Sequence, residues 1–367
     1  MDSASDAPLL CTPLHPAHVA AGARLVPFAG WEMPVQYAGI IEEHQAVRKA
    51  AGLFDVSHMG EARIRGRDAA AFLDRIMTND MASIRPGMAR YTVMCQPDGG
   101  CVDDLIVYRF SETEFLICLN ASNAAKDIAW MRSLIGPFKV EVLDECAAWA
   151  QLAIQGPLAE RILGLATALP LGTIKRFGFA VGEVAGASGC VVSRTGYTGS
   201  AGFEIYLPAA SAEKVARALL ELGKPHGLVP AGLGARDSLR LEANYPLYGH
   251  EISERISPIQ AGLGWTVKFA KGEFVGREAL RRQAEGGPAA SVVLFSLDDR
   301  RIARQGAQVY AGETPVGEVL SGTHSPTLNK PIGTALVAAG YTGSAELTVD
   351  IRGNRIPLRV AVEPFVK

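Results

Sequence analysis

The stretch ARYTVMCQPDGGCVDDLIVYRFSETEFLICLN (89–120) indicates a β-sheet. β-Branched and aromatic residues alternate with polar ones along it, which is typical of half-buried strands. The tetrad PDGG (97–100) interrupts this alternation with residues that favour a tight turn. The stretch is therefore expected to fold as a hairpin or a short meander.

The sequence on both sides of this stretch mixes helical and strand patterns, which predicts an α+β fold. Residues 40–54 carry apolar side chains at roughly helical spacing. Residues 150–155 and 190–206 have the composition of strands, and residues 210–223 follow a helical pattern. This partial recurrence leaves an internal duplication open, although no clean repeat is visible.

The C-terminal part has a different pattern of residues. After the segment EGGPAAS (284–290), which we interpret as a linker, short apolar runs alternate with glycine-containing turns. Such a pattern predicts a small β-barrel. We therefore expect two α+β parts at 1–140 and 141–283, with the catalytic aspartate in the first, and a C-terminal barrel domain at 290–367.

Composition limits the classes of function. A chain of 367 residues exceeds what one hydrophobic core usually serves, and 48% hydrophobic with 20% charged residues is ordinary for a globular protein. The net charge of −2 and the lack of a basic tract argue against nucleic acid as the main partner. No targeting signal or membrane span is visible, and six scattered cysteines without a CxxC pair suggest reduced thiols in a cytoplasmic protein.

Two motifs have the composition of a ligand site. SRTGYTGSAGFE (193–204) combines three glycines, which let a backbone approach a ligand closely, with Tyr197 and Glu204. GLGARDSLRLEANYPLYG (232–249) carries Arg236 and Arg240 among aliphatic residues, followed by two tyrosines. A carboxylate, arginines and tyrosines together suit a flat, polar-edged molecule that bears a carboxylate, such as a folate.

Asp103 and Asp104 form the strongest candidate for proton chemistry. Neighbouring residues of a strand point to opposite faces, so at most one of the two carboxylates faces a given pocket. The pair opens the apolar run LIVY, and a carboxylate buried there has a raised pKa and can handle a proton. The alternative is that both acids are solvated after a turn.

Other chemistries find little support. The seven histidines form neither HExxH nor a Cys/His cluster, so we expect no metal site. The apolar neighbours of Cys95 favour a buried structural thiol over a nucleophile. Neither a Walker A sequence nor GxGxxG after a strand is present, which argues against ATP and NAD.

The order of motifs along nearly the whole chain, from residue 12 to residue 366, resembles aminomethyltransferase, the T-protein of the glycine cleavage system. The segments that carry this resemblance are TPLHPAHVAAGARLVPFAGWEMPVQYAGIIEEHQAVRKAAGLFDVSHMGE, ARYTVMCQPDGGCVDDLIVYR, LNASNAAKD, AIQGP, SRTGYTGSAGFE, AGLGARDSLRLEANYPLYGHE, RIARQG, VGEVLSGTHSPTLNKPIGTALV and EPF. Each segment alone is weak evidence for the family, but all of them together, in the family's order, are highly specific.

The resemblance implies a three-domain, ring-like arrangement with a central channel for tetrahydrofolate. The family moves an aminomethyl group from the lipoyl arm of the H-protein to tetrahydrofolate, in glycine catabolism and one-carbon metabolism. The products are 5,10-methylenetetrahydrofolate, ammonia and the dihydrolipoyl H-protein. The family's essential carboxylate matches Asp104. Folate contacts fall on Met59, Tyr91, Asn120, Tyr197, Glu204, Arg236 and Tyr245.

Three alternatives remain. A folate-binding relative that assists iron–sulfur cluster assembly carries the motif KGCYxGQE, whereas the corresponding region here has no cysteine. A folate-dependent part of a dimethylglycine or sarcosine oxidase needs a flavin domain, and no dinucleotide fingerprint precedes residue 12. A module that only sequesters folate would not need Asp104, so the intact Asp-Asp-Leu run favours the enzyme.

Overall fold

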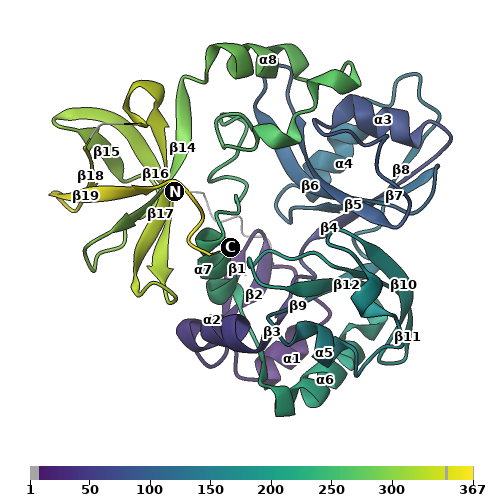
Figure 1. Cartoon of the computed structure of the whole chain (residues 1–367). Helices are drawn as coiled ribbons and strands as arrows, with labels where there is room; N and C mark the ends of the chain where they lie inside the picture. The colour runs from purple at the N-terminus through teal and green to yellow at the C-terminus, as the bar shows by residue number, and fades with distance from the viewer. Residues whose placement is uncertain (1–7, 344–345, 367) are drawn as a thin grey trace. The chain divides into compact units, whose positions relative to one another are not determined.

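The computed structural model describes residues 8–343 and 346–366 (Figure 1). The chain forms two compact units, and each is assembled from several stretches of sequence. The first comprises Met1–Gly60, Cys146–Gly196 and Ser200–Arg236; the second comprises Glu61–Glu145, Tyr197–Gly199 and Asp237–Lys367. The predicted boundaries of the three domains stay predictions.

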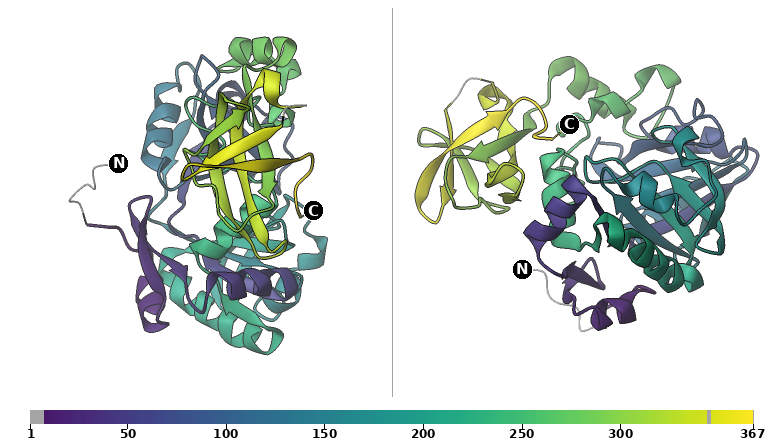
Figure 2. Two further views of the ribbon diagram at one scale, coloured as in Figure 1. Left: turned by 90° about the vertical axis from the view of Figure 1, so that its left-hand side faces the viewer. Right: turned by 60° about the horizontal axis from the view of Figure 1, so that its bottom comes forward.

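A six-stranded sheet forms the centre of the first unit. In spatial order its strands are β10 (Phe179–Val184), β11 (Ala187–Ser193), β12 (Gly202–Pro208), β9 (Trp149–Gln155), β3 (Ala51–Asp55) and β13 (Leu228–Pro230). Neighbouring strands pair antiparallel except β3 and β13, which are parallel. A separate hairpin, β1 (Arg24–Phe28) and β2 (Trp31–Gln36), completes its strands (Figure 2).

Helices bury their apolar faces against this sheet. On α6 the buried positions Ala212, Val215, Ala216 and Leu219 recur at helical spacing, and they join the core formed by the strands. This confirms the helix predicted for residues 210–223. The helices of the first unit are α1 (His15–Ala20), α2 (Ile40–Lys49), α5 (Ala159–Leu163) and α6 (Ala212–Gly223), and α7 (Leu233–Glu242) begins there.

A five-stranded sheet in the second unit contains the meander predicted for residues 89–120. In spatial order its strands are β5 (Met88–Cys95), β6 (Cys101–Arg109), β7 (Glu114–Leu119), β4 (Gly60–Arg65) and β8 (Glu141–Asp144). Two further helices belong to this part, α3 (Ala69–Ile76) and α4 (Ala124–Ser133). Cys95 is buried in an apolar cluster with Val93 and Phe274, as expected of a structural thiol.

The C-terminal strands close into a barrel, drawn in yellow and light green in Figures 1 and 2. Closure confirms the predicted barrel and, with the mixed sheets, the α+β class. The ring-like arrangement stays a prediction. The barrel strands in spatial order are β14 (Ala290–Leu297), β17 (Lys330–Ala338), β16 (Thr314–Ser325), β15 (Gln308–Ala311), β18 (Leu347–Ile351) and β19 (Asn354–Ala361).

Two local expectations were wrong. The helix expected over residues 40–54 ends at Lys49, and residues 51–55 form β3, which is buried throughout. A fully buried strand is apolar on both faces, so its short run cannot be told from a helix by periodicity. The expected linker at 284–290 is shorter, because α8 (Arg277–Gly286) extends into it and β14 begins at Ala290.

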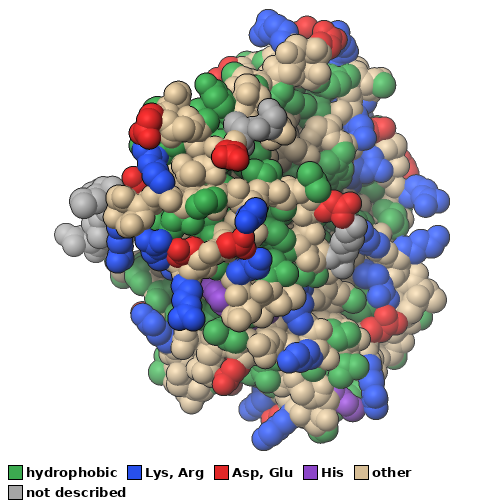
Figure 3. Space-filling model, turned by 60° about the vertical axis from the view of Figure 1, so that its left-hand side comes forward, with side chains coloured by type: hydrophobic (Ala, Val, Ile, Leu, Met, Phe, Trp, Pro, Cys, Tyr) green, Lys and Arg blue, Asp and Glu red, His purple; other side chains and the backbone are tan. Residues whose placement is uncertain are grey.

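The surface and the helices agree with the compositional analysis. Among the described residues, no helix is long and apolar enough to cross a membrane. Basic and acidic side chains are interspersed on the face that Figure 3 draws, rather than segregated by sign.

Candidate functional site

The paired aspartates lie near the start of β6. Asp103 is fully buried and Asp104 is partly exposed, which follows the alternation of a strand. The two carboxylates nevertheless share one partner, because Nδ2 of Asn120 donates to Asp103 Oδ1 and to Asp104 Oδ1, each at 2.8 Å. The two carboxylates are thus linked through the Asn120 amide.

The turn between β7 and α4 holds Asp103 in place. The backbone N–H of Asn120 donates to Asp103 Oδ2 at 3.2 Å, and Nδ2 of Asn123 donates to Asp103 Oδ1 at 2.8 Å. Asn123 is the N-cap of α4, and its own N–H bonds the carbonyl of Asn120 at 2.9 Å. These amide donors take the place of water around the buried Asp103 carboxyl group.

A third carboxyl group, Asp127 on α4, completes this cluster. Asp127 is fully buried, and neither carboxyl oxygen accepts a hydrogen bond from another described residue. Burial and the negative charge of Asp103 raise the pKa of Asp127 far above its usual range. Asp127 is therefore protonated at neutral pH, and its hydroxyl is placed to donate to the Asp103 carboxylate.

Asp104 is the member of the cluster that titrates near neutrality. Its Oδ2 accepts a hydrogen bond from the Tyr91 hydroxyl at 2.9 Å. Burial and the charge of Asp103 raise the pKa of Asp104 to about 7, and the hydrogen bonds from Tyr91 and Asn120 oppose this shift. Burial and the nearby Asp104 also raise the pKa of Tyr91, which remains a neutral donor.

The second unit contains two aromatic pairs, one of which includes Tyr91, the partner of Asp104. The ring of Tyr91, on β5, stacks on Trp265 with centroids 5.8 Å apart. Tyr197 and Tyr245 pack with centroids 5.8 Å apart, and the Tyr197 hydroxyl donates to the carbonyl of Pro246. The second unit thus brings together Tyr91, Asp104 and Asn120, with Tyr197 and Tyr245 as a second aromatic pair.

Sequence reasoning missed three members of this cluster. Trp265 is 57% exposed although it stacks on Tyr91, and its context GWT offers no recognisable signal. Asn123 and Asp127 did leave a trace, because NxxN followed by an acid four residues later places them at the start of a helix. That spacing indicates a helix cap, but it cannot show that the cap faces Asp103.

Glu204 lies on β12 in the first unit. Its Oε1 accepts a hydrogen bond from Nε2 of Gln151 on β9 at 3.1 Å, while Oε2 is buried without a hydrogen-bond partner among the described residues. Burial raises the pKa of Glu204, and the Thr195 hydroxyl, the charge of Arg236 and the Gln151 amide oppose the shift. A buried, unpaired carboxylate oxygen is costly unless a ligand supplies a donor.

Arg236 and Met59 belong to the same unit as Glu204. Arg236 is partly exposed on α7, and Met59 lies in the turn that follows β3. His58, next to Met59, is buried, and burial together with the charge of Arg236 lowers the pKa of His58 to about 4. His58 is therefore a neutral imidazole at physiological pH.

Two sequence features have structural rather than ligand-binding surroundings. Arg240 is almost fully buried, with ion pairs to Asp237 and Glu251 at 2.9 Å and a hydrogen bond to Ser321 of the barrel at 2.8 Å. The donors of Arg240 are therefore engaged within the protein. A Cβ atom on Gly196 would lie 2.0 Å from the Gln155 side chain, so this glycine allows packing against β9.

Family models match almost the entire chain. The model described as the GCVT N-terminal domain matches residues 14–271, and that of the glycine cleavage T-protein C-terminal barrel domain matches residues 291–367. The chain belongs to the glycine cleavage T-protein family. A curated aminomethyltransferase of this family from Desulforamulus reducens is 50% identical over 357 residues, covering 97% of this chain and 98% of the relative.

Further members of the glycine cleavage T-protein family agree in sequence and fold. An aminomethyltransferase from Anoxybacillus flavithermus is 48% identical over 360 residues, covering 97% of this chain and 98% of that protein. The crystal structure of glycine cleavage system aminomethyltransferase T from Bartonella henselae matches with a TM-score of 0.92 and 34% identity, over 98% of each chain. These findings confirm the expected aminomethyltransferase of the glycine cleavage system. The roles of individual site residues stay predictions.

Proposed function

We propose that this protein transfers the aminomethyl group on the lipoyl arm of an H-protein to tetrahydrofolate, with Asp104 as the residue that carries protons. The surroundings of Asp104 are the main support for this proposal. It is a partly exposed carboxylate held by Tyr91 and Asn120, with a pKa of about 7. A group whose pKa lies near the working pH is the most effective general acid or base.

The reaction requires such a group because two protons change place. The methylene carbon exchanges its bonds to the lipoyl sulfur and to the amine nitrogen for bonds to N5 and N10 of the folate. The two folate N–H protons end on the departing ammonia and on the thiol, and no oxidation or reduction occurs. We propose that Asp104 as a carboxylate accepts a proton from a folate nitrogen and returns it to a leaving group.

Glu204 supports the choice of a folate as the acceptor. The pterin edge presents an amino group and a ring N–H side by side, and a carboxylate can accept both. Glu204 Oε2 is buried without a partner among the described residues, so it is suited to that pair of donors. We further propose that Arg236 binds the folate tail, and that Met59, Tyr91, Asn120, Tyr197 and Tyr245 contact the folate.

The test compares wild type with Asp104→Asn, which keeps the shape of the side chain but replaces one acceptor oxygen with an NH2 group and removes the charge. Substrates are aminomethyl-loaded H-protein and saturating tetrahydrofolate, and both 5,10-methylenetetrahydrofolate and ammonia are measured. General acid–base catalysis contributes about 10²–10⁴-fold, so the variant should lose about that factor in kcat with folate affinity nearly kept. Asp98→Asn, at an exposed turn position, is the matched control and should be as active as wild type.

Two outcomes contradict the proposal. Equal turnover by Asp104→Asn and wild type removes Asp104 from the chemistry. Tight folate binding without turnover by wild type would instead favour a folate-binding module, and it would contradict the transfer reaction itself.

A further inference from the structure

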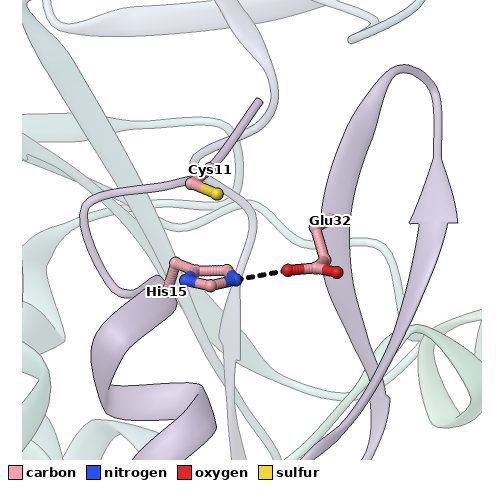
Figure 4. Close-up of side chains that lie close together, drawn as sticks. All are labelled: Cys11, His15 and Glu32. Atoms are coloured by element: carbon pink, nitrogen blue, oxygen red, sulfur yellow. Dashed lines mark hydrogen bonds and ion pairs between the residues drawn. The ribbon is translucent and has the colours of Figure 1, made fainter. Parts of the chain in front are cut away.

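Three metal-ligating side chains meet near the N-terminus of the first unit, away from the residues assigned above. The Sγ of Cys11, a ring nitrogen of His15 and a carboxylate oxygen of Glu32 all lie within 4.8 Å of one another (Figure 4). His15 Nε2 and Glu32 Oε2 already form an ion pair at 2.6 Å. Cys11 is exposed and the other two are partly buried, so an ion can reach all three from solvent.

The backbone around Cys11 is fixed on both sides. Leu10 forms a β-bridge with Trp31, in which Leu10 N bonds the carbonyl of Gly30 at 2.9 Å and Glu32 N bonds the carbonyl of Leu10 at 2.8 Å. On the other side, the buried Thr12 hydroxyl donates to Asp55 Oδ2 at 2.7 Å. Cys11 is therefore held beside the strand that carries Glu32.

His15 and Glu32 also project from regular elements. His15 is the first residue of α1, and its N–H bonds the carbonyl of Thr12 at 3.0 Å, while Glu32 belongs to β2. A site built on fixed backbone with movable side-chain tips is suited to metal binding, because only rotamers must adjust when the ion enters.

We propose that Cys11, His15 and Glu32 bind one Zn²⁺ ion, with water as the fourth ligand. Zn²⁺ accepts thiolate sulfur, imidazole nitrogen and carboxylate oxygen at about 2.0–2.3 Å, so tetrahedral ligands lie roughly 3.3–3.8 Å apart. The present separations, all within 4.8 Å, reach that range when side-chain rotamers adjust and the ion replaces the contact between His15 and Glu32. Thiolate and carboxylate together neutralise the charge of the ion.

The proposed ion ties the segment before α1 to the hairpin of β1 and β2. None of its ligands is among the residues proposed for folate binding or proton transfer, so the inference stands apart from the proposed function. It departs from the expectation of no metal site because Glu32 lies 17 residues from His15 in sequence. No local ligand motif spans that distance.

Co²⁺ is the probe for this site, because its thiolate complexes absorb in the near ultraviolet and it is displaced by Zn²⁺. The full chain, with its thiols reduced, is titrated with Co²⁺ and then with Zn²⁺. We expect saturation at one Co²⁺ per chain, a thiolate charge-transfer band, and loss of the band when one equivalent of Zn²⁺ is added.

Variants assign the ligands. Cys11→Ser should abolish the band, and His15→Ala and Glu32→Gln should each weaken Co²⁺ binding at least tenfold. Cys146→Ser changes the other cysteine with solvent access among the described residues, and it should leave the titration unchanged. A band that persists in Cys11→Ser, or wild-type affinity for Co²⁺ in the three ligand variants, would overturn the proposal, as would the absence of saturable binding by wild type.

Thermal unfolding separates lost binding from lost folding. Because an ion that binds only the folded state raises Tm, Zn²⁺ should raise the Tm of wild type and of Cys146→Ser but not that of Cys11→Ser. The metal-free proteins should all unfold at similar temperatures, since Cys11 is exposed. An equal rise of Tm in Cys11→Ser would contradict the site.

Discussion

Two regions of the molecule share one topology and differ in the charges around their acidic residues. From β4 to β8 the order of elements is strand, helix, three-stranded meander, helix and strand, and β9 to β13 repeats it. In each sheet the meander pairs through its third strand with the strand that precedes it. The order of elements thus recurs, except that β3 lies between β9 and β13, whereas β8 pairs directly with β4.

The turn after the first strand shows how closely the two regions correspond. IRGRDA (64–69) and IQGPLA (154–159) both place a glycine between strand and helix, with φ of +142° at Gly66 and +135° at Gly156. Each glycine N–H bonds the carbonyl just before the third meander strand, that of Thr113 or Ala201. A side chain is excluded at both positions, because a Cβ atom would lie within 2.4 Å of a backbone oxygen.

The same scaffold holds its acidic residues in opposite electrostatic settings. Asp104, near the start of the second meander strand, has Asp103 as its neighbour and titrates near pH 7. Burial also raises the pKa of Glu204, near the start of the third meander strand, but the Thr195 hydroxyl, the charge of Arg236 and the Gln151 amide oppose this shift. The charged neighbours of the two acids, rather than the shared order of elements, therefore account for the difference between their surroundings.

Glu204→Gln should produce the largest effect among the tests of this comparison. A hydrogen bond to a charged group contributes about 1.5–3 kcal/mol, so the Kd for tetrahydrofolate should rise about 10–100-fold. At saturating folate kcat should stay near wild type, in contrast to Asp104→Asn. Isothermal titration and steady-state rates measure the two quantities. A large loss of kcat with unchanged Kd would reverse the assigned roles.

The pH dependence of stability tests the surroundings of Asp104. Its folded-state pKa is raised from 3.8 to about 7, so its contribution to stability is complete below pH 3.8 and is lost as the pH rises through 7. Asp104→Asn carries no charge and escapes this loss. Between pH 5 and pH 8, the free energy of unfolding of Asp104→Asn, relative to that of wild type, should increase by on the order of 2 kcal/mol. Urea unfolding at both pH values measures these free energies. The same change with pH in wild type and in the variant would show that the pKa of Asp104 is not shifted.

Substitutions at Asp127 test whether the cluster of Asp103, Asp104 and Asp127 retains a bound proton at neutral pH. Asp127→Asn keeps a neutral donor toward Asp103 and should change the free energy of unfolding by less than about 1 kcal/mol. Asp127→Leu removes the donor and should cost about 1–3 kcal/mol. Urea unfolding at pH 7 distinguishes the two variants. A strongly destabilised Asp127→Asn beside a stable Asp127→Leu would show that no proton is shared.

Tyr91→Phe should have the smallest effect. The Tyr91 hydroxyl donates to Asp104 and lowers its pKa, so removing the hydroxyl raises that pKa by less than about one unit. Because Asp104 acts as a carboxylate, the rate should rise with pH through about 7 in wild type and through a slightly higher pH in the variant. A shift of the kcat profile to lower pH would contradict this contact.

Much of the fold was predictable from local pattern. The turn at 97–100, the amphipathic spacing of residues 212–219 and the glycine-separated runs after residue 290 identified the meander, α6 and the barrel. These features depend on neighbours in sequence, so periodicity shows them directly. The buried strand β3 was missed because an apolar run without alternation fits a helix equally well.

The sequence by itself determined the class of fold, the family motifs and Asp104 as a candidate, because each rests on residue types at short spacing. Only the tertiary structure decided which groups meet. It placed Asp127 against Asp103, engaged Arg240 with Glu251, and brought Glu32 to His15 and Cys11. Charge interactions act through space over a few ångströms, so the pKa of a carboxyl group depends on residues that the order of the chain does not reveal.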